Sequence, residues 1–143
     1  MRDAQRPPGG RTIDDLLQQV RDRIDRVEPA EAARRLAAGA LLIDTRPAEQ
    51  RHRDGEVPGA VVVDRNVLEW RLDPASPYRI PEVSDYDLEV IVLCNQGYSS
   101  SLVADTLRTL GLRRAVDVVG GFEDGPRSGS RSPASAARTP RPE

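Results

Sequence analysis

The stretch that decides the fold covers residues 90–101 and reads Val90-Ile91-Val92-Leu93-Cys94-Asn95-Gln96-Gly97-Tyr98-Ser99-Ser100-Ser101. Its first four residues are apolar and mostly β-branched, which predicts a buried strand. The cysteine is followed by a short loop with one glycine, and apolar spacing predicts a helix over residues 100–110. A strand, a short loop and a helix in this order can bind an anion, because loop N–H groups and the helix N-terminus carry partial positive charge.

The thiol of Cys94 is therefore expected to be a reactive nucleophile. Cysteines at helix N-termini have pKa values of roughly 3.5–7.5, and the thiolate is the nucleophilic form. Gly97 lets the backbone curl around the sulfur, and the serines that follow it can cap the helix. The alternative interpretation is a buried, inert cysteine that ends a strand. The composition of the loop favours the reactive cysteine.

The rest of the chain alternates short apolar strands with helices. Strands are predicted at 40–44, 60–63, 90–93 and 115–119, and helices at 29–38, 47–53, 66–72 and 100–110. This alternation predicts an α/β fold with a central parallel sheet flanked by helices on both faces. Ligands of such sheets bind beyond the carboxyl ends of the strands, which is where Arg46, Arg65 and Cys94 stand.

An extra helix is predicted before this alternating pattern, over residues 12–27, with Thr12 as its N-cap. We expect one folded domain over residues 12–125. The last segment, 126–143, is rich in Pro, Ser and Arg and has no large apolar residue, so it cannot offset its ordering entropy. Residues 1–11 have a similar composition. Both ends are therefore predicted to be disordered.

The composition excludes several classes of enzyme. All 21 basic residues are arginine, which excludes lysine Schiff-base chemistry, pyridoxal-phosphate enzymes and the Walker phosphate loop. One cysteine and one histidine allow neither an internal disulfide nor a Cys/His zinc cage. We therefore expect neither a metal nor a cofactor.

The charge and hydropathy of the chain narrow the choice of partners. A net charge of −2 gives no electrostatic reason to expect a nucleic acid. No apolar run approaches the roughly 18 residues of a membrane span. The polar, Pro/Gly-rich start over residues 1–10 is unlike a signal peptide. These features predict a cytoplasmic protein with small-molecule substrates, and the sequence indicates no particular protein partner.

Three segments together resemble the single-domain rhodanese family of sulfurtransferases. An apolar strand ending in Asp44-Thr45-Arg46 is similar to its Asp-x-Arg signature, and residues 55–60 are similar to its Gly-His-Ile-Pro-Gly-Ala segment. The third segment is the cysteine loop, followed by a helix and by Gly120-Gly121-Phe122. The three occur in the usual order and at the usual separations, and the resemblance covers about residues 27–122.

The resemblance implies an α/β fold with a central parallel sheet and a sulfurtransferase that works through a persulfide on Cys94. The sulfane sulfur would come from thiosulfate or a similar donor and pass to cyanide or a physiological thiol. Loop amides would stabilise the persulfide anion, as an oxyanion hole stabilises oxygen. The binding loop implied for this sulfur comprises Asn95, Gln96, Gly97, Tyr98, Ser99 and Ser100.

This chain departs from the family at the end of the loop, where Ser99 stands in place of the usual arginine. Arg46 and Arg65 are therefore candidate anion-binding residues, with a structural or surface ion pair as the alternative for each. Phosphatases and arsenate reductases of this superfamily need a longer loop with an arginine, so the sequence disfavours them. A non-catalytic rhodanese-like module, which binds a partner or relays sulfur, remains the alternative to the enzyme.

Overall fold

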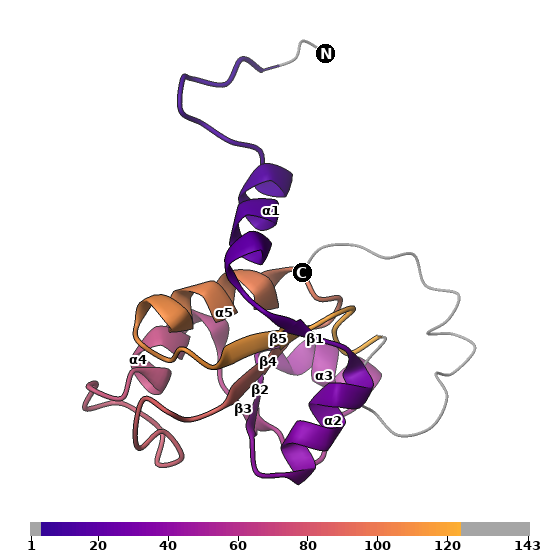
Figure 1. Cartoon of the computed structure of the whole chain (residues 1–143). Coiled ribbons are helices and arrows are strands. Elements are labelled where there is room, and N and C mark those ends of the chain that lie inside the picture. The colour runs from indigo at the N-terminus through magenta and orange to yellow at the C-terminus, as the bar shows by residue number, and fades with distance from the viewer. Residues whose placement is uncertain (1–3, 124–143) are drawn as a thin grey trace.

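The computed structural model describes residues 4–123, and it alternates helices with short strands along most of the chain (Figure 1). The helices are α1 Ile13–Arg23, α2 Pro29–Ala37, α3 Ala48–Asp54, the short 3-10 helix η1 Arg65–Val67, α4 Leu68–Leu72 and α5 Ser99–Thr109. The strands are β1 Arg26–Val27, β2 Leu41–Asp44, β3 Val61–Val62, β4 Val90–Leu93 and β5 Ala115–Val118.

The five strands form one parallel sheet in the order β1-β5-β4-β2-β3. Strand β4 lies at the centre, so the residue that follows it, Cys94, stands at the middle of the carboxyl edge. The adjacent strand β2 leads to Thr45 and Arg46 on the same edge. The predicted parallel α/β fold is confirmed.

Successive residues of the central strands face opposite sides of the sheet, and each side has its own core. On one side Ile43, Val90 and Val92 belong to the cluster that includes buried residues of α1, α4 and α5. On the other side Leu42 and Ile91 belong to a cluster with Ala32 of α2. The prediction that helices flank both faces is therefore confirmed, and it accounts for the continuous apolar character of these strands.

The predicted N-terminal helix is present as α1, but it is shorter than its sequence pattern suggests. The Oγ1 atom of Thr12 accepts a hydrogen bond from the N–H of Asp15 at 2.9 Å, as expected of an N-cap. The helix ends at Arg23 rather than at residue 27. Arg26 and Val27 instead form β1 beside β5, since pairing with the sheet edge and burial of Val27 override the helical spacing.

The two ends of the chain lie largely outside these elements. Residues 4–11 are exposed and form neither helix nor strand, and the disorder predicted for 1–11 stays a prediction. The tail predicted over 126–143 lies outside the described residues, as does the end of the domain predicted at 125. Within residues 4–123, no helix has both the length and the apolar character required to cross a membrane.

Replacing Leu107 with alanine tests the core that supports the cysteine loop. Leu107 of α5 is fully buried, so Leu107→Ala should lower the free energy of unfolding by about 2–5 kcal/mol. Val67→Ala removes apolar atoms from a side chain that is 46% exposed and should change it by less than about 0.5 kcal/mol. Urea denaturation measures the free energy of unfolding of both variants, and an equal decrease in the two would contradict the assignment of Leu107 to this core.

Candidate functional site

Cys94 stands immediately after β4, and two backbone N–H groups point at its sulfur. The Sγ atom accepts hydrogen bonds from Gly97 N at 3.1 Å and from Ser100 N at 3.4 Å. Ser100 lies in the first turn of α5, whose N–H groups have no partner within the helix. The side chain is 1% exposed, so these bonds form in a largely water-free environment. The arrangement is suited to a negatively charged sulfur.

The turn after β5 closes over the cysteine loop through backbone contacts. Phe122 N donates to Cys94 O at 2.8 Å, and Glu123 N donates to Asn95 O at 3.0 Å. Gly97 and Gly121 both have positive φ angles, of 88° and 64°. A Cβ atom on Gly121 would lie 2.6 Å from both Cys94 O and Gly97 N. The approach of the two backbones therefore requires glycine.

The other residues of the predicted binding loop fall into two groups. The side-chain amides of Asn95 and Gln96 donate to the carboxylate of Glu123 at 3.3 and 3.4 Å, and that carboxylate is buried. Tyr98 is exposed and Ser99, the first residue of α5, is half-buried. Sequence reasoning did not identify Glu123, whose buried side chain accepts hydrogen bonds from both side-chain amides of the loop.

A second buried carboxylate, Asp117 of β5, organises the start of α5. It accepts hydrogen bonds from Ser100 Oγ and Ser101 Oγ, both at 2.8 Å. Arg26 of β1 binds it through Nε at 2.8 Å and Nη2 at 3.1 Å. Sequence reasoning missed this residue too, although an acid inside an otherwise apolar, doubly covered strand must be paired when it is buried.

Positive charge reaches the loop from the N-terminal segment rather than from the loop itself. The carbonyl oxygen of Gly97 accepts from Arg21 Nη2 at 2.7 Å and from Arg26 Nη2 at 3.0 Å. Arg21 also donates through Nε to Ser101 Oγ at 3.1 Å, and its guanidinium lies 5.9 Å from the ring centre of Tyr98. Burial and the adjacent charge of Arg26 lower the pKa of Arg21, whereas Asp117, Tyr98 and Cys94 act in the opposite direction.

Arg46, one of the two predicted anion-binding residues, lies in a buried ion pair. Its Nη2 atom binds Asp44 Oδ2 at 2.8 Å and Gly55 O at 2.9 Å, and its guanidinium lies 3.9 Å from the ring centre of Phe122. The residue is 2% exposed. Arg46 therefore joins β2, the residue after α3 and the turn after β5, while its buried Nη1 atom has no hydrogen-bond partner among residues 4–123. Its predicted anion-binding role stays a prediction.

Arg65, the other candidate, lines a cavity of about 380 Å³ together with Arg46 and Arg51. The Arg65 side chain is 41% exposed and pairs with Glu69 at 3.1 Å. Thr45 also lines the cavity, and its N and Oγ1 atoms donate to Leu93 O at 2.9 and 3.0 Å. The cavity lies on the same edge of the sheet as Cys94, at the ends of β2 and β3, and Cys94 is not among its lining residues.

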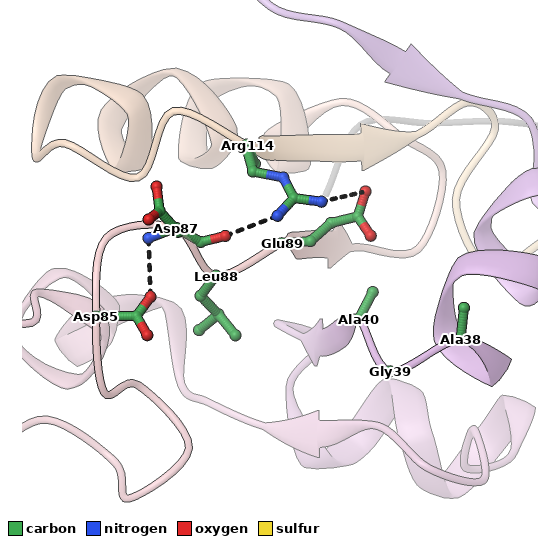
Figure 2. Close-up of a pocket in the computed structure, with 8 residues that line it drawn as sticks. All are labelled: Ala38, Gly39, Ala40, Asp85, Asp87, Leu88, Glu89 and Arg114. Carbon is green, nitrogen blue, oxygen red and sulfur yellow. Dashed lines mark hydrogen bonds and ion pairs between the residues drawn. The ribbon is translucent and has the colours of Figure 1, made fainter.

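A second cavity, of about 320 Å³, lies at the opposite edge of the sheet, before β2 and β4 (Figure 2). Asp85, Asp87 and Glu89 line it together with Arg114, which donates to Asp87 O at 2.9 Å. None of its lining residues is a cysteine, serine or histidine. Across residues 4–123 no cluster of His, Cys, Asp and Glu has the composition of a metal site.

Comparison with known proteins gives one family and several similar structures. The model of the rhodanese-like domain matches residues 28–125. A Rhodopseudomonas palustris protein of unknown function, named as a possible tyrosine phosphatase, is 29% identical, with a TM-score of 0.72 over 83% of this chain and 92% of that chain. The human single-domain sulfurtransferase is 26% identical, with a TM-score of 0.59 over 69% and 92%. The polysulfide-sulfur transferase homodimer of Wolinella succinogenes shares the fold at 19% identity, with a TM-score of 0.60 over 78% and 79%.

Adding a methyl group at Gly121 tests the close backbone contact beneath the cysteine. Gly121→Ala should lower the free energy of unfolding by about 1–3 kcal/mol more than Gly39→Ala, because overpacking adds to the backbone strain. Gly39 is the matched control, since it has a φ of 109° but no atom within 4 Å of an added Cβ. Urea denaturation of both variants measures the difference, and equal destabilisation would contradict the contact.

Proposed function

The chain belongs to the rhodanese-like domain family, and from that premise we propose that it is a sulfurtransferase whose Cys94 carries a sulfane sulfur as a persulfide. The observation that supports this most is the pair of N–H groups, from Gly97 and Ser100, on the sulfur of the sole cysteine. The similarity to the human sulfurtransferase supports the same activity.

The first half-reaction loads the cysteine. The Cys94 thiolate attacks the outer sulfur of thiosulfate and forms a new S–S bond. The original S–S bond of thiosulfate breaks, and its electron pair leaves with sulfite. The products are a cysteine persulfide anion and sulfite, so the total charge is unchanged. The amides that hold Sγ also lower the energy of the persulfide anion, because they are already oriented toward negative charge.

The second half-reaction unloads the sulfur onto a thiophilic acceptor. Cyanide or a thiolate attacks the terminal sulfur of the persulfide, and the electron pair of the S–S bond returns to Cys94. The products are thiocyanate or an acceptor persulfide, together with the regenerated thiolate. Because the chain has no second cysteine, the persulfide cannot be lost to an internal disulfide.

The anionic donor needs a cation near the sulfur, and the loop itself contains no arginine. We assign this role to Arg65, which follows β3, two strands from β4, and whose half-exposed guanidinium lines the cavity at the carboxyl edge of the sheet. Arg51 lines the same cavity, with its Nε atom 3.9 Å from Glu56 Oε1. The buried Nη1 atom of Arg46 has no hydrogen-bond partner in the part of the chain that the structure describes. Arg46 contributes indirectly, since its buried ion pair holds the wall of the cavity in place.

Two other functions are compatible with the family. The Rhodopseudomonas relative is named as a possible tyrosine phosphatase, but no arginine stands between Cys94 and Ser100 to bind a phosphate. The low exposure of Cys94 is the observation that favours a non-catalytic binding or sulfur-relay module. The experiments below separate both from a sulfurtransferase.

Intact mass after incubation with thiosulfate tests the persulfide directly. The wild-type chain should gain the mass of one sulfur atom, and Cys94→Ala should gain none. Addition of cyanide should remove the extra sulfur and release thiocyanate.

A set of sulfur donors and a phosphotyrosine substrate complete this experiment. If thiosulfate, polysulfide and a persulfide thiol all fail to load wild-type protein, the sulfurtransferase is excluded and the non-catalytic module stands. Hydrolysis of the phosphotyrosine substrate that depends on Cys94 would establish the phosphatase instead.

Replacing Arg65 tests the proposed site for the anionic donor. Arg65→Ala should raise KM for thiosulfate about 2- to 5-fold with little change in kcat, as expected for loss of about 0.5–1 kcal/mol from an exposed charge. Arg113→Ala removes an exposed arginine paired with Asp87 and serves as control. Equal KM values for both variants would remove Arg65 from the site.

A further inference from the structure

The segment that precedes the family match reaches the cysteine loop with two arginines. We propose that α1 and β1 are a working part of the sulfur site, in which Arg21 and Arg26 act as positioning residues that hold the loop around Cys94. Both residues lie before residue 28, where the match to the family model begins. The proposal deepens the sulfurtransferase assignment and rests on it.

Arg26 connects the two elements that supply hydrogen bonds to the sulfur. Its Nη2 atom donates to the carbonyl of Gly97, whose own N–H binds Sγ. Its Nε atom binds Asp117, which in turn accepts from the hydroxyl of Ser100, whose N–H also binds Sγ. One guanidinium therefore fixes both amide donors relative to each other.

Arg21 repeats the same connection from α1. It donates to Gly97 O through Nη2 and to Ser101 Oγ through Nε. Ser101 shares the Asp117 carboxylate with its neighbour Ser100. The loop and the first turn of α5 are thus joined twice, by two side chains that come from outside the loop.

The arginines also set the charge around the thiolate. The groups that face the loop are Arg21 from α1, Arg26 from β1, Asp117 from β5, Glu123 from the following turn and Tyr98 from the loop itself. Arg26 pairs with the buried carboxylate of Asp117, and Arg21 interacts favourably with the charges of both Asp117 and Cys94, so the two arginines offset a carboxylate that would otherwise disfavour a negative sulfur. Loss of either arginine leaves the thiolate close to a less compensated negative charge.

The N-terminal helix provides its own control in Arg23. This residue also joins α1 to α5, through a bidentate pair with Asp105 at 3.0 and 2.8 Å. It makes no hydrogen bond to the loop, and its side chain is 56% exposed. Arg23→Gln therefore removes a comparable connection between the two helices and leaves the contacts at Gly97 intact.

Titration of the thiolate tests the proposal without requiring any catalysis. The ultraviolet absorbance of the thiolate is followed against pH, with Cys94→Ala as the blank, in wild type and in the variants Arg21→Gln, Arg26→Gln and Arg23→Gln. We expect the midpoint of the Cys94 titration to rise by about one pH unit in the first two variants, because the arginine that each variant loses favours the negatively charged thiolate over the neutral thiol. It should not move in Arg23→Gln. Arg21→Lys, which keeps the charge, should recover part of the shift.

Midpoints for Arg21→Gln and Arg26→Gln that coincide with that of Arg23→Gln overturn the proposal, provided circular dichroism shows folded protein. If Arg26→Gln does not fold, the partly exposed Arg21 decides alone, through its Gln and Lys variants. A failure of the sulfurtransferase assignment is seen separately, as wild-type protein that no donor loads. The thiolate titration remains readable in that case, because it follows ionisation of the Cys94 thiol and requires no sulfur transfer.

Discussion

A buried carboxylate, that of Asp117, is the constraint on which the arrangement of the site depends. It lies inside the sheet with no exposure to solvent, so it must be neutralised and hydrogen-bonded within the protein. Arg26 supplies the charge, and two serine hydroxyls at the start of α5 supply the remaining hydrogen bonds. These interactions hold β1, β5 and α5 together next to the end of β4, where Cys94 follows the strand.

The second constraint is that glycine is required where the backbone of the cysteine loop contacts the backbone of the turn after β5. Gly97 and Gly121 bring the loop and the turn after β5 so close that a Cβ atom on either residue would collide with the backbone of the other segment. What the thiol meets is therefore mainly peptide N–H groups, whose positions are set by the fold. Side chains such as those of Tyr98 and Arg65 lie farther out, around the peptide groups that surround the thiol.

The spacing of apolar residues, glycines and capping residues predicted the helices, strands and turns that depend on neighbouring residues in the sequence. The apolar run before Cys94, the glycine loop and the amphipathic helix after it lie close to where their spacing indicates, and Thr12 caps α1 as expected. The contacts of Arg21, Arg26 and Glu123 were not predictable in this way. Each pairs with a residue tens of positions away, and nothing in the spacing of nearby residues indicates such a partner. The same reason explains why residues 26 and 27 were assigned to a helix.

The separation of the arginine–carboxylate pair has a consequence for folding. Arg26 and Asp117 are 91 positions apart, and the adjacent strands that carry them are the first and last of the five along the chain. Contacts of this kind require closure of a long loop, whose entropy must be overcome before the contact contributes. The hydrogen bonds from Arg26 to Gly97 and Asp117 therefore form only once β1 has paired with β5, so the support of the cysteine loop is completed late in folding.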